Sequence, residues 1–170
     1  MLPQAISKDL LTGPPDEDGR FRYARRYWNT IRGTRRFPAR RDFDPVDIPF
    51  LLPVTALIER CAEGHDFRYR LIGTTIDALN QGYHTGHRLS TIAAAAQPAI
   101  HSSDLRRCCE AGQPIFGHYR YDGRHAGDIR ALNVQLLPFG ETDAAVDLIW
   151  AVVVRDFGDA RPLRPCRPRR

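Results

Sequence analysis

The chain has 170 residues, of which 42% are hydrophobic, and its formal net charge is +5. This length fits one ordinary domain, and the apolar fraction is enough for a hydrophobic core and excludes a wholly disordered chain. The sequence has no apolar run of about 18 residues, so it predicts no transmembrane helix, and residues 1–11 lack the pattern of a secretory signal. We therefore expect a cytoplasmic protein with no membrane contact.

The N-terminal part of the chain predicts a loose segment followed by an amphipathic helix. Residues 1–19 combine prolines with an acidic cluster and read as a flexible lead-in. Apolar residues then recur at helical spacing until Gly33, which ends the helix. This apolar face would cover the sheet or a second subunit, so its residues are our candidates for a dimer or partner contact: Phe21, Ala24, Tyr27, Trp28 and Ile31.

The segment from Arg20 to Arg41 contains nine arginines and no acidic residue. It is a candidate basic surface, with Arg22, Arg25, Arg26, Arg35, Arg36, Arg40 and Arg41. One interpretation is a nucleic-acid interface, in which arginines meet phosphates and the aromatic side chains stack on bases. The alternative, which helical spacing favours, is that the aromatics belong to the core and the arginines pair with acids such as Asp42, Asp44 and Asp47.

The middle of the chain predicts short elements. Four prolines in residues 34–53 exclude one long helix and favour an extended crossing, with a short helical turn from about Asp44. Strands are predicted over residues 54–60 and 65–73, and a short helix over 74–80. Residues 91–111 favour helix, divided by Pro98 and ended by Gly112.

Three strands are predicted in the C-terminal half, over residues 114–121, 129–139 and 145–155. The last is apolar on both faces, so we expect it to be central and covered on both sides. The chain thus predicts an α+β domain over residues 20–157, with a five-stranded antiparallel sheet and an N-terminal amphipathic helix. Residues 158–170, rich in arginine and proline, are expected to form a disordered tail.

This order of elements, two strands, short helices and three strands, resembles a PAS domain. Short motifs extend the resemblance, over residues 20–156, to compact bacterial proteins that consist of little more than one PAS module. The motifs are Tyr27-Trp28, Arg32-Gly33, Arg36 to Asp42, Asp44-Pro45, Leu51 to Pro53, Phe67 to Thr74, Thr85-Gly86 and Leu137-Pro138.

The resemblance implies a sensory or regulatory module and not an enzyme. PAS folds hold a small molecule, or a packed core, between the sheet and short helices on one face, and they commonly pair through an N-terminal helix. We therefore expect a homodimer that acts on a signalling protein in trans. Alternation along the elements makes the candidates for pocket residues Tyr69, Ile76, Leu79, His101, Leu105, Val134 and Trp150.

The sequence requires no cofactor. His101 is the first candidate for a haem ligand, but a lone helical histidine does not favour haem, and no cysteine lies in a motif typical of a flavin adduct. His84 and His87 lack a third ligand nearby, so no metal site is predicted. No catalytic motif occurs. A small pocket enzyme of steroid-isomerase-like architecture would need a buried base, for which Asp147 is the one candidate.

The charge is strongly separated along the chain. Residues 20–41 carry +9 and residues 158–170 carry +4, so the remaining residues sum to 5 − 9 − 4 = −8. The core of the predicted domain is therefore acidic. Association of a basic helix with an acidic core of the same protein is at least as natural as an external anionic partner.

Overall fold

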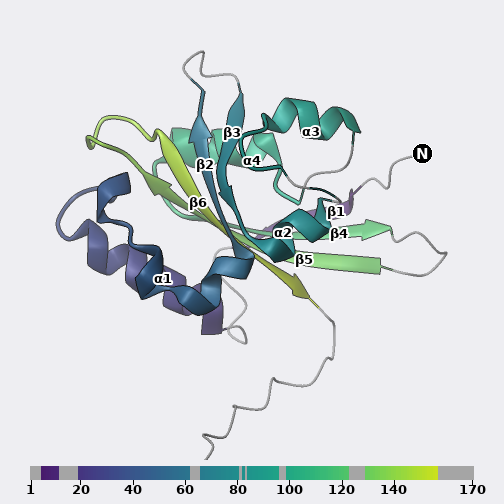
Figure 1. Ribbon diagram of the computed structural model, residues 1–170, viewed down its shortest axis with the longest axis horizontal. Helices are drawn as coiled ribbons and strands as arrows, with labels where there is room; N and C mark the ends of the chain where they lie inside the picture. Colours follow the sequence, from purple (N-terminus) through teal and green to yellow (C-terminus); the bar gives the residue numbers. More distant parts are fainter. Residues whose placement is uncertain are drawn as a thin grey trace, which may run out of the picture.

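One antiparallel sheet organises the chain (Figure 1). Our computed structural model describes residues 5–11, 19–61, 66–80, 82, 84–95, 99–122 and 129–156. The sheet has the strand order β1-β4-β5-β6-β2-β3. Its strands are β1 (Ala5–Leu11), β2 (Thr55–Arg60), β3 (Phe67–Ile72), β4 (Ile115–Asp122), β5 (Ile129–Phe139) and β6 (Leu148–Asp156). The five predicted strands are thus confirmed as β2 to β6.

The sixth strand, β1, was not expected. It pairs antiparallel with β4 and so extends the sheet at the edge opposite β3. The prolines and the acidic cluster of residues 1–19 instead predict a flexible lead-in. The two stretches around β1, residues 1–4 and 12–18, lie outside the described residues, as does the predicted tail.

Cross-strand pairing divides the core residues between the two faces of the sheet. Directly paired residues share a face, and successive residues of a strand alternate between faces. We call one side the α1 face, with Phe116, Gln135, Leu137, Trp150 and Val152. The other is the α4 face, with Ile58, Tyr69, Tyr119, Leu132, Val134 and Ile149. All of Leu148 to Val154 is buried, which confirms that the last strand is central and covered on both sides.

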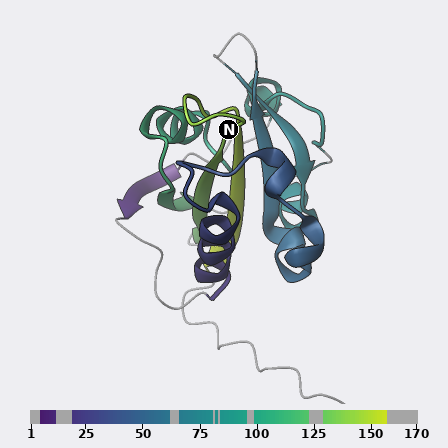
Figure 2. The ribbon, with the colours of Figure 1, turned by 90° about the vertical axis from the view of Figure 1, so that its left-hand side faces the viewer.

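Helix α1 (Gly19–Arg32) covers the α1 face through its apolar stripe. Phe21 is fully buried and packs edge-to-face on Phe116, with ring centroids 5.1 Å apart. Trp28 donates its indole N–H to the backbone oxygen of Pro138 at 2.8 Å. Figure 2 shows α1 in front of the sheet. The apolar stripe that the sequence predicts on this helix therefore packs against the sheet of the same chain.

The proline-rich crossing between α1 and β2 forms three short 3₁₀ helices: η1 (Arg40–Asp42), η2 (Pro45–Asp47) and η3 (Pro49–Val54). Asp44 caps η2, because its carboxylate accepts a hydrogen bond from the backbone N–H of Val46 at 2.9 Å. Pro45 follows at the first helical position, where its missing donor costs nothing. The predicted turn from about Asp44 is therefore present, with a physical reason for its start.

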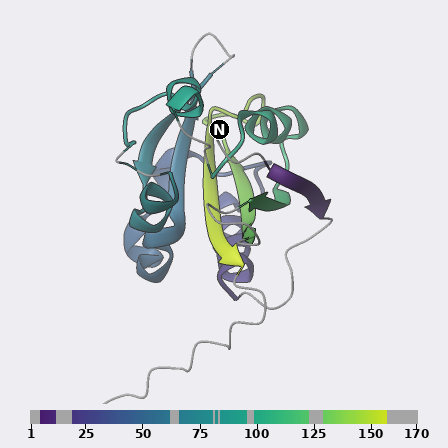
Figure 3. The ribbon, with the colours of Figure 1, turned by 90° about the vertical axis from the view of Figure 1, so that its right-hand side faces the viewer.

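Three helices, α2 (Thr74–Leu79), α3 (Leu89–Ala95) and α4 (Ser102–Ala111), follow β3. Figure 3, from the side opposite to Figure 2, shows α2 in front of β2 and β3, and α4 above and to the right of β6 (yellow). Gly73 precedes α2 where the backbone touches η3: a Cβ there would lie 2.2 Å from the backbone oxygen of Leu52. Gly112 ends α4 in the left-handed conformation, with φ +59°.

Candidate functional site

Two buried polar side chains on the α4 face have hydrogen-bonding atoms without a partner. The Tyr69 hydroxyl oxygen (Oη) and the Asn80 side-chain nitrogen (Nδ2) are both buried and unpaired among the described residues. The Asn80 oxygen (Oδ1) is satisfied, because it accepts a hydrogen bond from the backbone N–H of Ala99 at 2.9 Å. A buried donor without a partner loses its hydration without compensation, so these two atoms mark a position suited to an additional acceptor.

Tyr69 remains a neutral donor at any ordinary pH. Burial raises the pKa of Tyr69 to about 12, and the negative charge of Asp77 acts in the same direction. The Asn80 amide opposes this rise in pKa, so its side chain lies close to the Tyr69 hydroxyl. The pair therefore offers two donors, one from β3 and one from the end of α2.

A second polar group lies on the same face between β4 and α4. The Tyr119 hydroxyl donates to the carboxylate of Asp104, which is 1% exposed. The ring of His101, at the start of α4, stacks on the Tyr119 ring with centroids 5.0 Å apart. A Cβ on Gly117 would lie 2.8 Å from the Tyr119 hydroxyl oxygen, so this glycine leaves room for the tyrosine. These contacts attach α4 to the sheet.

Six of the seven predicted pocket residues lie on the α4 face or on the helices over it. Tyr69 and Val134 come from the sheet, and the others are Ile76, Leu79, His101 and Leu105. Trp150 lies on the α1 face instead, where its ring packs edge-on against Phe43 at 5.1 Å. Its strand is apolar on both faces, so alternation alone could not assign the side.

Sequence patterns did not single out Asn80, Asp104 or Tyr119. An asparagine after a short helix reads as a cap, and Asn80 does stand at the end of α2. Asp104 lies in the first turn of α4, where an acidic residue is expected because it interacts favourably with the helix dipole. Gly117 two residues before Tyr119 was the available signal, because a glycine within a strand often marks a close approach.

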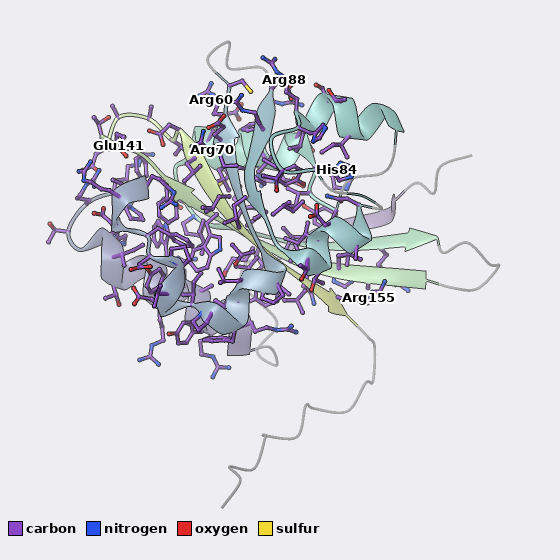
Figure 4. The ribbon with its side chains drawn as sticks, viewed as in Figure 1. Arg60, Arg70, His84, Arg88, Glu141 and Arg155 are labelled. Atoms are coloured by element: carbon purple, nitrogen blue, oxygen red, sulfur yellow. The ribbon has the colours of Figure 1, made fainter. Side chains whose placement is uncertain are left out.

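Most of the predicted basic surface contacts its own chain. Arg35 donates to the backbone oxygens of Gly140 and Glu141 at 2.9 and 3.0 Å and lies 3.4 Å from the Asp42 carboxylate. Arg41 forms an ion pair with Glu141, which Figure 4 labels in the loop between β5 and β6. The predicted pairing with acids therefore holds for Asp42. Arg40 donates to the backbone oxygen of Phe43 at 3.0 Å.

Arg36 links the two faces of the sheet. Its backbone N–H donates to the Asp143 carboxylate at 3.1 Å, and its guanidinium donates to the backbone oxygen of Ala111 at 3.2 Å. Ala111 is the last residue of α4, where a cation also meets the negative end of the helix dipole. One side chain thus connects the segment after α1 with the end of α4.

The remaining predicted basic residues, Arg22, Arg25 and Arg26, are exposed on α1. Arg25 lies over the Trp28 ring, with its guanidinium carbon 5.8 Å from the ring centroid. The candidates for a dimer contact on this helix are covered by their own sheet: Phe21, Ala24 and Trp28 are buried, and Tyr27 and Ile31 are half-buried. Their apolar face is therefore not available to a second subunit in this arrangement.

Two arginines of β3 and the candidate base Asp147 contact their own chain. Arg68 and Arg70 both pair with Glu59 across the β2–β3 hairpin, and Figure 4 labels Arg70 there. Asp147 is exposed in the turn before β6, and its carboxylate accepts a hydrogen bond from the Glu141 backbone N–H at 3.0 Å. An exposed carboxylate in a turn does not supply the buried base that an enzyme of steroid-isomerase type would require.

The described residues contain no group of three or more His, Cys, Asp or Glu placed to hold a metal ion. In the same part of the chain, no helix combines the length and the apolar character that crossing a membrane requires.

The fold defines the class of protein: one antiparallel sheet, short helices on one face and an amphipathic helix on the other. The PAS domain family matches residues 20–153, which is more than three quarters of the chain. The chain belongs to this family, as the sequence motifs predicted. Searches of the curated proteins and of the solved structures return no match. PAS domains are typically sensory, and the family suggests a sensory or regulatory role.

Proposed function

We propose that this chain is a cytoplasmic sensory protein that binds a small neutral molecule on the α4 face. It acts as a homodimer on a signalling protein in trans and performs no catalytic step of its own. The observation that carries the proposal is the pair of buried, unpartnered donors, Tyr69 Oη and Asn80 Nδ2. Native proteins leave few such groups unsatisfied, so each requires a partner.

The donor pair limits the chemistry of the ligand. Asn80 Nδ2 can only donate, because the Asn80 oxygen already accepts from Ala99, and Tyr69 Oη can donate as well, because its raised pKa keeps the proton in place. The matching group is an acceptor oxygen, such as a carbonyl. The charge of Asp77 disfavours an anion beside Tyr69, so a neutral ketone, lactone or amide fits better than a carboxylate. Buried Ile76, Leu105 and Val134 favour an apolar body.

The same contacts provide a route for a signal. Asn80 holds the end of α2 to the chain that leads into α4. Arg36 holds the end of α4 to the segment after α1. A ligand that bonds Tyr69 and Asn80 would favour one packing of α2 and α4 on the sheet, and Arg36 would transmit this shift in population to the α1 face.

The test is native mass spectrometry of the purified protein, with an absorbance spectrum of the same sample. We expect a small bound molecule without a haem or flavin spectrum, and its loss in the Tyr69→Phe variant. The matched control is Tyr23→Phe, because Tyr23 is an exposed tyrosine on α1. If the variant and the control retain the same ligand, or if neutral carbonyl compounds fail to raise the melting temperature of the ligand-free protein, the proposed ligand site is wrong.

Arg36 tests the route. The Arg36→Ala variant should bind the ligand with nearly unchanged affinity, while the ligand no longer changes hydrogen exchange in α1. The control is Arg107→Ala, an exposed arginine on the same helix, α4, whose end Arg36 contacts. Unchanged transmission in Arg36→Ala would refute the coupling and leave the ligand site standing.

A further inference from the structure

Three large hydrophobic side chains lie exposed together beside α1, and we call them the apolar patch: Tyr23, Val46 and Phe50. Their exposed fractions are 40%, 80% and 54%, and they are the large hydrophobics that the described residues expose. The rings of Tyr23 and Phe50 pack edge-to-face with centroids 4.7 Å apart. The Tyr23 hydroxyl donates to the backbone oxygen of Asp47, next to Val46, at 3.2 Å. Patches of exposed apolar side chains on a soluble domain commonly mark an interaction site.

The patch is held by fixed structure. Val46 and Phe50 belong to η2 and η3, each of which begins with a proline. Ile48 and Leu51, which lie between and beside them, are fully buried and anchor these turns to the core. Val46 and Phe50 are therefore presented outward on a backbone that is anchored beneath them.

Charges of both signs border the patch, and the Asp47 carboxylate accepts a hydrogen bond from the Tyr27 hydroxyl at 3.1 Å. Arg26 follows Tyr23 by three residues, so it lies on the same side of α1, and it is exposed. Asp44 and Asp47 are exposed on the other border, around η2. Among the described residues, none of the three forms an ion pair, although Arg35 and Arg41 nearby each pair with acids.

We infer that the apolar patch is a self-association surface, occupied by a second copy of this chain related by a two-fold axis. In such a pairing Arg26 of each copy meets Asp47 of the other, around the paired apolar side chains. A purely acidic partner would be repelled by Asp44 and Asp47, and a purely basic one by Arg26. A surface with both signs around an apolar centre is complementary to itself.

This inference deepens the homodimer element of the proposed function, and it does not require the ligand. It also places the interface on the apolar patch and not on the apolar stripe of α1, because that stripe is buried between the helix and the sheet. A stable interface buries about 800 Å² on each partner, and three side chains supply only its centre. We therefore expect a dissociation constant on the order of micromolar.

Light scattering after size-exclusion chromatography tests the surface on the full chain. The wild-type protein should change from monomer to dimer across the micromolar range, whereas Phe50→Asp and Val46→Asp should remain monomeric. The control is Gln113→Asp, which adds the same charge at an exposed position after α4 and should still dimerise. A wild-type monomer at every concentration overturns the inference and assigns the patch to a different protein, and a dimeric Phe50→Asp variant overturns it as well.

Charge exchange tests the two-fold pairing. Arg26→Glu and Asp47→Arg should each weaken dimerisation at least about tenfold, because each places like charges opposite one another twice. An equimolar mixture should form a heterodimer, since both of its cross-pairs are then attractive. Recovery in the mixture also shows that both variants fold. A mixture no tighter than the separate variants refutes the pairing. Tyr69→Phe should dimerise normally, so failure of ligand binding and failure of this interface are distinguishable.

Discussion

The two buried tyrosines of the α4 face should respond in opposite ways to loss of the hydroxyl group. Tyr69 Oη has no partner among the described residues, whereas Tyr119 Oη donates to the buried carboxylate of Asp104. Replacement by phenylalanine removes the same atom from two fully buried rings, so the ring packing is matched. Comparing Tyr69→Phe with Tyr119→Phe therefore measures how much the hydrogen bond of the hydroxyl contributes to the free energy of unfolding.

The magnitudes follow from the cost of leaving a buried group unpaired. Removing an unsatisfied hydroxyl returns roughly 1 kcal/mol of the desolvation penalty, so Tyr69→Phe should stabilise the ligand-free protein by about that amount. Tyr119→Phe removes a hydrogen bond to a buried carboxylate and should destabilise by about 1.5–3 kcal/mol. For a domain of this size, 1 kcal/mol corresponds to about 2–4 °C in melting temperature.

Urea unfolding of protein refolded without its ligand measures both values. The midpoint should rise for Tyr69→Phe and fall for Tyr119→Phe, with equal slopes for all three proteins. If Tyr69→Phe destabilises as much as Tyr119→Phe, the Tyr69 hydroxyl has a strong partner in the ligand-free protein. The reasoning that assigns this atom to a ligand would then be wrong.

Three other predictions concern the fold. Gly73→Ala should cost about 2–3 kcal/mol by urea unfolding, because its Cβ would lie 2.2 Å from the Leu52 backbone oxygen, and Gly19→Ala, with nothing within 4 Å, should stay within about 0.5 kcal/mol. Burial raises the pKa of Cys109 from 9.0 to about 11, so the unfolded chain ionises first and stability should fall between pH 9 and pH 11. Cys109→Ser should reduce that fall, and an equal fall in the variant would contradict this assignment. Glu59→Gln removes the shared partner of Arg68 and Arg70 on the surface and should cost less than about 1 kcal/mol, with a smaller effect at high salt.

Local sequence patterns were sufficient for most of the elements. Strand β6 was expected to be central because Leu148 to Val154 is apolar throughout, and it lies between β5 and β2. Helix α1 followed from the spacing of Phe21, Ala24 and Trp28, which are the residues it buries. The break between α3 and α4 followed from Pro98. In each case a local rule and the tertiary structure favour the same conformation.

Long-range relations were beyond those patterns. Pairing of β1 with β4 joins segments about a hundred residues apart, and nothing in residues 5–11 alone indicates a partner. The side on which Trp150 lies depends on register with β5, which a strand apolar on both faces does not reveal. Only one member of the Tyr69–Asn80 pair could be predicted. Alternation along the strand selects Tyr69, whereas Asn80 after a short helix is typical of a helix cap.

The structure shows which contacts the basic segment of the chain makes. Arginines of the basic segment after α1 form hydrogen bonds within the chain, because Arg35 and Arg36 contact the β5–β6 turn and the end of α4. Arginine suits this role, since its planar group donates to several acceptors at once. These contacts leave fewer cations for phosphates, so the net charge of +5 is weak support for a nucleic-acid partner. Arg22, Arg25 and Arg26 remain exposed on α1, and Arg26 forms with Asp44 and Asp47 a mixed-sign border that suits a second copy better than a polyanion.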